Sequence, residues 1–313
     1  MDIRLVELGS GIRIACHLSG PLGGPAMVLL HALGEQAASW SAAAPRFASR
    51  YRVVNLELRG HGSSDRPGVY SFELMRDDVI EVLEVLGLHD VVLVGHSMGG
   101  AVAYLVAQAQ PGRIARLVVE DVPPPFPRVR QVPERPKGAL GFDWAVVPAI
   151  VDQVNDPTRR WWKRLTDISS PTLLIGGRPA SHIPQELLVE VSEAIPECTL
   201  VTIPVGHNVH QVRPSNFSDV VLGWLAEADA KPTRSRLREL QGLSRRSDSP
   251  PGALHVGFAD RNQEPEPASR GRIKTWTRTS CSSIPPLNNC GAGGPGRRIR
   301  LRPLPLSWRT GRS

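Results

Sequence analysis

Residues 91–101 read Val-Val-Leu-Val-Gly-His-Ser-Met-Gly-Gly-Ala, an apolar run that leads into a Gly-x-Ser-x-Gly turn. The pattern predicts a buried strand, a sharp turn and a helix, and such a turn leaves a serine hydroxyl exposed. Gly95 and Gly99 provide space where a Cβ would clash, and the helix N-terminus directs the Met98 amide toward a developing oxyanion. We therefore expect Ser97 to be a nucleophile. The alternative is a glycine-rich turn with an incidental serine.

On both sides of this stretch, short apolar runs alternate with helical patterns up to about residue 228. Most of the runs are continuous Val, Leu and Ile segments, as in strands covered on both faces. The alternation predicts an α/β protein with a mainly parallel central sheet and helices on both faces. The expected strands are residues 12–18, 26–31, 53–58, 91–95, 114–121, 172–175 and 199–203. The expected helices are residues 72–86, 98–110 and 214–228.

Residues 122–170 interrupt this alternation with several prolines and then four aromatic side chains, Phe142, Trp144, Trp161 and Trp162. No strand pattern is visible there. The stretch predicts a short helical cap over one end of the sheet, and the alternative is a long surface loop.

The charge of the chain is unevenly distributed. Residues 231–313 contain 17 Lys and Arg against 5 Asp and Glu, whereas residues 1–230 contain 20 against 25. The formal +7 therefore comes from the C-terminal segment and says nothing of what the body binds. Rich in Arg, Pro, Ser and Gly and without periodicity, residues 231–313 are expected to be a disordered tail. The alternatives are that this tail binds nucleic acid or anionic lipid, or that it originates in a shifted reading frame.

We expect residues 1–230 to form one domain that binds neither nucleic acid nor a membrane. The first residues lack the apolar run of a signal peptide, and no stretch reaches the ~18 apolar residues of a membrane span. The four cysteines form no CxxC pair and are expected to be reduced. These features predict a soluble cytoplasmic protein, with its oligomeric state open.

Together the motifs resemble the α/β-hydrolase superfamily over roughly residues 1–228. Residues 31–34, His-Ala-Leu-Gly, are similar to the family's His-Gly-x-Gly oxyanion loop, with Ala32 in place of a glycine. The resemblance implies that the Leu33 amide is the second oxyanion donor, beside Met98. Residues 59–65, Arg-Gly-His-Gly-Ser-Ser-Asp, resemble a structural turn of the family without a catalytic role.

A serine hydroxyl needs a base to act as a nucleophile at neutral pH. In this fold the chain order is serine, acid, histidine, with the histidine in the loop after the last strand. His207 in Val205-Gly206-His207 matches the family's Gly-His signature. His210 is the rival and is interpreted as a polar loop residue. His96 is expected to point away from the serine.

The position of the catalytic acid in this sequence differs from the commonest pattern of the family. Residues 177–184 read Gly-Arg-Pro-Ala-Ser-His-Ile-Pro, so Ala180 stands where most relatives carry an Asp. Other branches, haloalkane dehalogenases among them, carry the acid one strand earlier. The resemblance then implies Asp121 as the acid, with Glu120 pointing the opposite way. The alternatives are an ordinary loop carboxylate and a serine–histidine dyad without an acid.

These residues predict a serine hydrolase that cleaves a carboxylic ester, lactone or thioester of a small, largely apolar substrate, an activity of class EC 3.1. A serine nucleophile argues against dehalogenase and epoxide-hydrolase chemistry, which proceeds through a carboxylate. Phe142, Trp144 and Trp161 are expected to bind the substrate. No cofactor and no metal are expected, and the expected partner is a small-molecule substrate. The alternative is a non-catalytic small-ligand-binding protein of the same fold, in view of Ala180.

Overall fold

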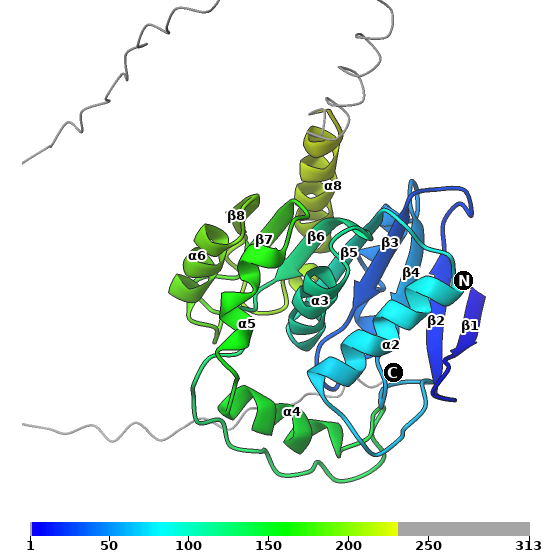
Figure 1. The fold of residues 1–313 in the computed structure, drawn as a ribbon, viewed down its shortest axis with the longest axis vertical. Coiled ribbons are helices and arrows are strands. Elements are labelled where there is room, and N and C mark those ends of the chain that lie inside the picture. The colour runs from blue at the N-terminus through cyan, green and yellow to red at the C-terminus, as the bar shows by residue number, and fades with distance from the viewer. Residues whose placement is uncertain (1, 231–313) are drawn as a thin grey trace, which may run out of the picture. The chain divides into compact units, whose positions relative to one another are not determined.

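The computed structural model describes residues 2–230, and the expected tail at residues 231–313 lies outside this part of the chain. The strands are β1 (Asp2–Glu7), β2 (Arg13–Ser19), β3 (Ala26–Leu30), β4 (Arg52–Leu56), β5 (Val91–His96), β6 (Ile114–Glu120), β7 (Thr172–Gly176) and β8 (Cys198–Thr202). They form an 8-stranded sheet in the order β1-β2-β4-β3-β5-β6-β7-β8 (Figure 1). All neighbours from β4 to β8 pair in parallel, whereas β2 pairs antiparallel with β1 and β4. The expected mainly parallel sheet is confirmed.

Helices cover both faces of this sheet. They are α1 (Ala44–Phe47), α2 (Phe72–Val85), α3 (Met98–Ala109), α4 (Val146–Asn155), α5 (Arg160–Lys163), α6 (Gln185–Ala194), α7 (Val209–Val212) and α8 (Pro214–Ala230), with 3-10 turns η1 (Ala37–Trp40) and η2 (Leu165–Asp167). One hydrophobic cluster joins the sheet to α2, α3 and α6, and the other joins it to η1, α1 and α8. Among the described residues, no helix combines the length and the apolar character that a bilayer crossing requires.

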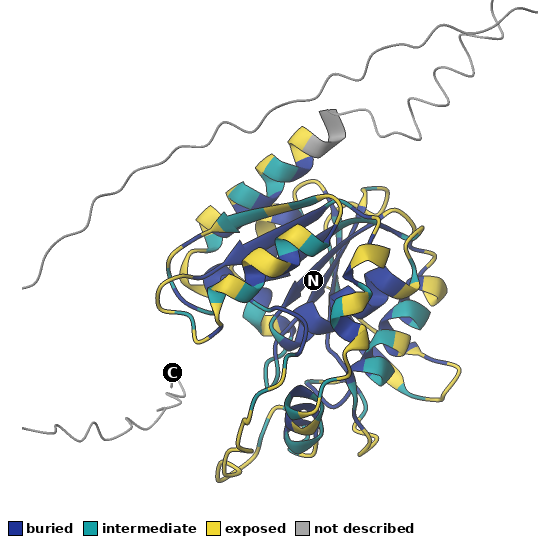
Figure 2. Ribbon diagram, turned by 60° about the vertical axis from the view of Figure 1, so that its left-hand side comes forward, coloured by how far each residue is buried: buried dark blue, intermediate teal, exposed yellow. Residues whose placement is uncertain are grey.

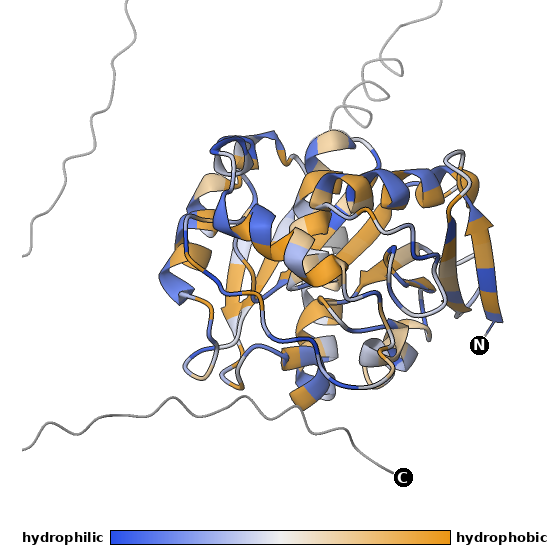
Figure 3. Cartoon of the chain, turned by 90° about the horizontal axis from the view of Figure 1, so that it is seen from below, coloured by the Kyte–Doolittle hydropathy of each residue, from blue (hydrophilic) through white to orange (hydrophobic). Residues whose placement is uncertain are grey.

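Strand β3 shows why the central runs are apolar throughout. Val28 and Leu30 belong to the cluster under α2 and α3, whereas Met27 and Leu29 belong to the cluster under α8. Successive side chains of a strand point to opposite faces, so a strand covered on both sides is apolar at every position. Figure 2 shows the strands buried between helices whose outer faces are exposed, and Figure 3 shows the same strands as hydrophobic.

Strand β1 and helices α1, α6 and α7 were not expected from the sequence. β1 is an edge strand in which Val6 alone is buried, while Ile3 and Leu5 are 55% and 47% exposed. Its pattern is therefore neither a continuous apolar run nor a clean alternation. In α6, Leu188 and Val191 alone are buried, which leaves a weak helical signal.

Residues 122–170 fold into α4, α5 and η2 and contain no strand, as expected for a helical cap. This segment is attached to the loop that follows β4. The Asp143 amide donates to the Gly60 carbonyl at 2.7 Å, and His61 forms an isolated bridge with Phe142. The attachment lies at the carboxyl end of a parallel strand, where open α/β sheets form their sites.

Leu29→Ala is predicted to lower the free energy of unfolding by about 2–5 kcal/mol, because Leu29 is fully buried between the sheet and α8. Ile3→Ala, on the exposed edge strand, is the control and should change it by at most about 0.5 kcal/mol. Urea unfolding followed by circular dichroism measures both values. Equal losses in the two variants would contradict the assignment of core and edge.

Candidate active site

Ser97 occupies a strained turn between β5 and α3. Its backbone has φ 51° and ψ −115°, a conformation that a residue with a side chain rarely adopts. A Cβ on Gly95 would lie 2.4 Å from the Gly99 carbonyl oxygen, and a Cβ on Gly99 would lie 2.5 Å from the Leu30 carbonyl oxygen. The turn therefore requires glycine at both flanking positions. The Ser97 amide is held by the Glu120 carbonyl at 3.2 Å.

Two backbone amides near this turn, those of Leu33 and Met98, have no hydrogen-bond acceptor among residues 2–230. Met98 is the first residue of α3, where the helix dipole adds partial positive charge. Leu33 lies in the loop that follows β3. Both expected donors are therefore free to bind an anionic oxygen.

His31 holds the loop that contains Leu33. Its Nδ1 donates to the Ala32 carbonyl at 2.8 Å, and its Nε2 accepts from the Leu58 amide at 3.0 Å. Complete burial lowers the pKa of His31 to about 3, so the ring is neutral and fixed in this tautomer. His61 holds Gly34, the residue that follows Leu33, because the His61 Nε2 accepts from the Gly34 amide at 3.2 Å.

The structure brings Asp121 and His207 together. Asp121 follows β6, is fully buried and has φ 48°, and its Oδ2 accepts from His207 Nδ1 at 2.8 Å. This bond directs Nε2 of His207 away from the carboxylate. In the described part of the chain no hydrogen bond joins His207 to the Ser97 hydroxyl; in unliganded sites such bonds commonly tighten only when substrate binds.

Three further groups hold the Asp121 carboxylate. Oδ1 accepts from the Gly177 amide at 2.9 Å and from Gln185 Nε2 at 2.8 Å, and Oδ2 accepts from the Ser181 hydroxyl. Burial by itself raises the pKa of Asp121, but the hydrogen bonds of His207 and of these three groups outweigh it and lower the pKa. Asp121 therefore remains a carboxylate that orients the histidine.

Ser181 and Gln185 were missed by sequence reasoning, although Ser181 lies in the loop that carries Ala180 and Gln185 begins the helix α6 that follows it. The loop contacts the loop of His207 closely, since the Gly206 amide donates to the Gly177 carbonyl at 2.7 Å. A Cβ on Gly206 would lie 3.6 Å from the Ala180 Cβ. The loop thus supplies hydrogen-bond donors to Asp121 in place of a carboxylate of its own.

His210 is not the polar loop residue that the sequence suggested. It is fully buried in α7, where its Nδ1 lies 2.7 Å from Glu120 Oε2 and its amide donates to Glu120 Oε1 at 3.0 Å. The Trp40 ring stacks on it with centroids 3.9 Å apart. Burial raises the pKa of Glu120, but the charges and hydrogen bonds of His210 and His96 outweigh it and lower the pKa. Glu120 and Asp121 therefore each pair with a different histidine.

Two more histidines contact His207. His96 Nε2 donates to the His207 carbonyl at 3.0 Å, which ties the base loop to the residue before Ser97. His182, which sequence reasoning did not single out, packs edge-on against His207 with ring centroids 4.4 Å apart. Burial and the neighbouring His207 lower the pKa of His182 to about 4, so this ring is neutral at neutral pH.

The cap aromatics separate into two groups. Phe142 stacks on His61 with centroids 5.7 Å apart, and a Cβ on Gly34 would lie 3.3 Å from the Phe142 ring. Trp144 lies 6.3 Å from Phe142 between ring centroids, so both are near the loop of Leu33. Trp161 does not join them, because it is buried against Phe72.

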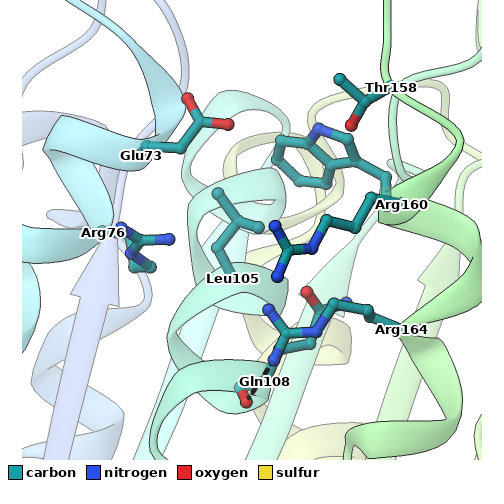
Figure 4. A pocket seen from close by; sticks show the side chains of 8 residues that line it. Glu73, Arg76, Leu105, Gln108, Thr158, Arg160 and Arg164 are labelled. Atoms are coloured by element: carbon teal, nitrogen blue, oxygen red, sulfur yellow. Dashed lines mark hydrogen bonds between the residues drawn. The ribbon is translucent and has the colours of Figure 1, made fainter.

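Trp161 lines a separate cavity of about 140 Å³ between α2, α3 and α5 (Figure 4). The other lining residues are Glu73, Arg76, Leu105, Gln108, Thr158, Arg160 and Arg164. Gln108 is about 16 Å along α3 from Ser97, at ~1.5 Å per helical residue. This cavity is therefore separate from the serine, and Arg76 and Arg164 are already paired with Asp77 and Asp167.

The family model for the alpha/beta hydrolase fold matches residues 25–140. The chain is 40% identical to mouse epoxide hydrolase 4 over 119 residues, which cover 37% of this chain and 33% of that protein. It is 27% identical to the mouse sn-1-specific diacylglycerol lipase ABHD11 over 256 residues, which cover 67% of this chain and 83% of that protein. The match thus spans a third of the first relative and most of the second. Among solved structures, the thioesterase domain from the curacin biosynthetic pathway aligns with TM-score 0.62 and 21% identity over 71% of this chain and 99% of that one.

Asp121→Asn is predicted to destabilise the protein most at neutral pH. Because folding lowers the pKa of Asp121, its carboxylate contributes stability above the unfolded pKa of about 3.9, and that contribution is lost as the pH falls through the folded pKa. The difference in unfolding free energy between wild type and variant should therefore shrink below about pH 4. Asp152→Asn, at an exposed position of α4, is the control. A pH-independent difference for Asp121→Asn would contradict the prediction.

Proposed function

Because the chain belongs to the α/β-hydrolase superfamily, we propose that it is a serine hydrolase that cleaves an ester-type bond through an acyl-enzyme on Ser97. The observation that carries the proposal is the 2.8 Å contact between the buried Asp121 carboxylate and His207, whose loop is tied by His96 to the nucleophile turn. The relatives, by their names hydrolases that act on epoxides or on diacylglycerol, support hydrolysis as the reaction class.

In the acylation step, His207 Nε2 removes the hydroxyl proton of Ser97 while the serine oxygen attacks the carbonyl carbon. Asp121 keeps the proton of His207 on Nδ1 and stabilises the imidazolium that forms. The free amides of Leu33 and Met98 donate to the oxyanion. Collapse of the tetrahedral intermediate breaks the bond to the alcohol or thiol, which leaves with the proton from His207.

In the deacylation step, water takes the place of the leaving group. His207 removes one proton from the water as its oxygen attacks the acyl carbon, and Ser97 leaves with that proton. The net reaction adds one water across the ester-type bond and returns the enzyme to its starting state. His182, neutral beside His207, adds no positive charge that would oppose formation of the imidazolium.

A serine nucleophile separates this chain from carboxylate-dependent chemistry. Epoxide opening and dehalogenation proceed through an alkyl-enzyme ester on a carboxylate, which a serine cannot form. The relative matched over most of its length is a diacylglycerol lipase by name, which favours a carboxylic ester. Phe142 and Trp144 near the Leu33 loop favour a small, largely apolar acyl group.

Ser97→Ala is predicted to reduce kcat at least about 10⁴-fold on p-nitrophenyl esters, lactones and acyl thioesters, because the nucleophile is lost. Ser49→Ala, at an exposed serine remote from the site, is the matched control and should keep wild-type kcat. Circular dichroism should show that both variants fold. Wild-type turnover in Ser97→Ala would contradict the proposed mechanism.

Asp121→Asn is predicted to lower kcat on the order of 10⁴-fold, since an amide favours the wrong tautomer of His207, as in the serine-protease triad. Ala180→Asp in that background should recover part of the loss, because position 180 lies beside Gly206 in the contact between the two loops. Steady-state kinetics on the best ester measures both. Full activity in Asp121→Asn would show that His207 works without this acid.

A further inference from the structure

Three side chains from different segments converge behind the proposed active site: Glu35 after β3, His96 at the end of β5, and His210 in α7. One nitrogen of each histidine and a carboxylate oxygen of Glu35 all lie within 4.8 Å of one another. Both histidines are fully buried, whereas the Glu35 side chain is 20% exposed. None of these three side chains takes part in the proposed bond-making or proton-transfer steps, although His96 positions the loop of His207.

The outer hydrogen bonds fix the tautomer of each histidine. His96 Nε2 lies 3.0 Å from the His207 carbonyl, which can only accept, so Nε2 carries a proton, and in the neutral ring Nδ1 has a lone pair. His210 Nδ1 lies 2.7 Å from the Glu120 carboxylate, so Nδ1 carries a proton, and in the neutral ring Nε2 has a lone pair. Neither lone pair has a hydrogen-bond partner among residues 2–230, and His96 Nδ1 is 3.8 Å from Glu35 Oε2.

When both rings are neutral, three lone pairs face one another in a buried site, which is unfavourable, and a cation removes that penalty. Two imidazole nitrogens and one carboxylate oxygen form a common donor set for zinc and related transition metals. We propose that Glu35, His96 and His210 bind a divalent transition-metal ion, with zinc as the preferred occupant.

The outer hydrogen bonds of Glu35, His96 and His210 match those that metal-binding side chains usually make in proteins. A metal-ligating histidine usually donates its other nitrogen to a carboxylate or a backbone carbonyl. His210 does the first, through Glu120, and His96 does the second, through His207. Glu35 has its own partner, since its Oε1 accepts from Gln211 Nε2 at 2.7 Å. Every proposed ligand is thus already oriented by an outer hydrogen bond.

The three donor atoms must move slightly closer together to bind a zinc ion. Zinc bonds of about 2.0–2.2 Å place tetrahedral donors roughly 3.4 Å apart. The 3.8 Å between His96 Nδ1 and Glu35 Oε2 is close to this value, and Glu35 is the partly exposed member of the set. Its exposed side also gives the ion a route into the site and leaves a position for water.

The role of the ion is structural and independent of the reaction proposed for Ser97. Glu35 follows Leu33 in one loop, His96 precedes Ser97, and His210 is three residues after His207. One ion would therefore join the loop of Leu33, the turn of Ser97 and the segment that carries His207. Two other occupants satisfy the lone pairs without a metal: a proton on one imidazole, or a water that donates two hydrogen bonds.

The test uses the full chain, purified without a polyhistidine tag and stripped with a chelator. Zn²⁺ alone is titrated by calorimetry, thermal unfolding is recorded with and without it, and Co²⁺ absorption in the visible range reports the ligand field. We expect one equivalent bound, a rise in Tm of about 5 °C or more at 100-fold the Kd, and Co²⁺ bands of a four-coordinate site.

Glu35→Gln is the main variant because its side chain is partly exposed, and it should weaken binding at least 10-fold and remove the Co²⁺ bands. Glu120→Gln, which disturbs only the partner of His210, should weaken binding about 10- to 100-fold. His17→Gln is the matched control: its Nε2 lies 3.4 Å from Glu57 Oε1, outside the cluster, and it should bind Zn²⁺ as wild type does.

Two results would overturn the proposal. The first is a folded wild-type protein that binds no Zn²⁺, in which case a proton or a water occupies the cluster. The second is unchanged binding and Co²⁺ spectra in Glu35→Gln, which would place the ion elsewhere in the chain. Because the readouts are binding and stability, neither result depends on whether Ser97 is catalytic.

Discussion

The site depends on two carboxylates placed side by side at the end of β6. Glu120 is the last residue of β6, Asp121 with φ 48° begins the turn that follows, and the two carboxylates take different partners. Glu120 binds His210 inside the core, and Asp121 binds His207 at the edge where the serine lies. His207 lies in the loop before α7 and His210 lies three residues later in α7, so this pair of bonds sets both the position and the rotation of that segment. Everything proposed for the reaction requires His207 to be held in this way.

The absence of an acid at position 180 does not leave its loop without a role. The loop retains its contact with the base loop through Gly177 and Gly206, and it directs Ser181 and Gln185 onto the Asp121 carboxylate. Burial of a carboxylate is unfavourable unless hydrogen bonds compensate. Ser181 in this loop and Gln185 at the start of α6 thus supply donors that keep the Asp121 carboxylate charged.

Much of this site could be predicted from the sequence, because Ser97, Leu33, Met98 and His207 lie in motifs whose local geometry is determined by nearby residues. The position of Asp121 could be inferred only by resemblance, and the structure places it against His207. The burial of His210 and the contacts of Ser181, Gln185 and His182 could not be predicted, because they depend on packing between segments far apart in the chain. Trp161 shows the same limit: its residue type suggests a pocket, but its neighbours are Phe72 and the flank of α3.

The proposed function requires that Ser97 is an activated nucleophile and that His207 activates it. The most direct measurement is the rate of phosphonylation by a fluorophosphonate probe, with the adduct located by peptide mass spectrometry in the folded wild type and in His207→Ala. We predict a single adduct on Ser97 that forms rapidly in the wild type and at least about 10³-fold more slowly in His207→Ala. An unlabelled wild type, an adduct on another residue, or equal rates in the two proteins would contradict the claim.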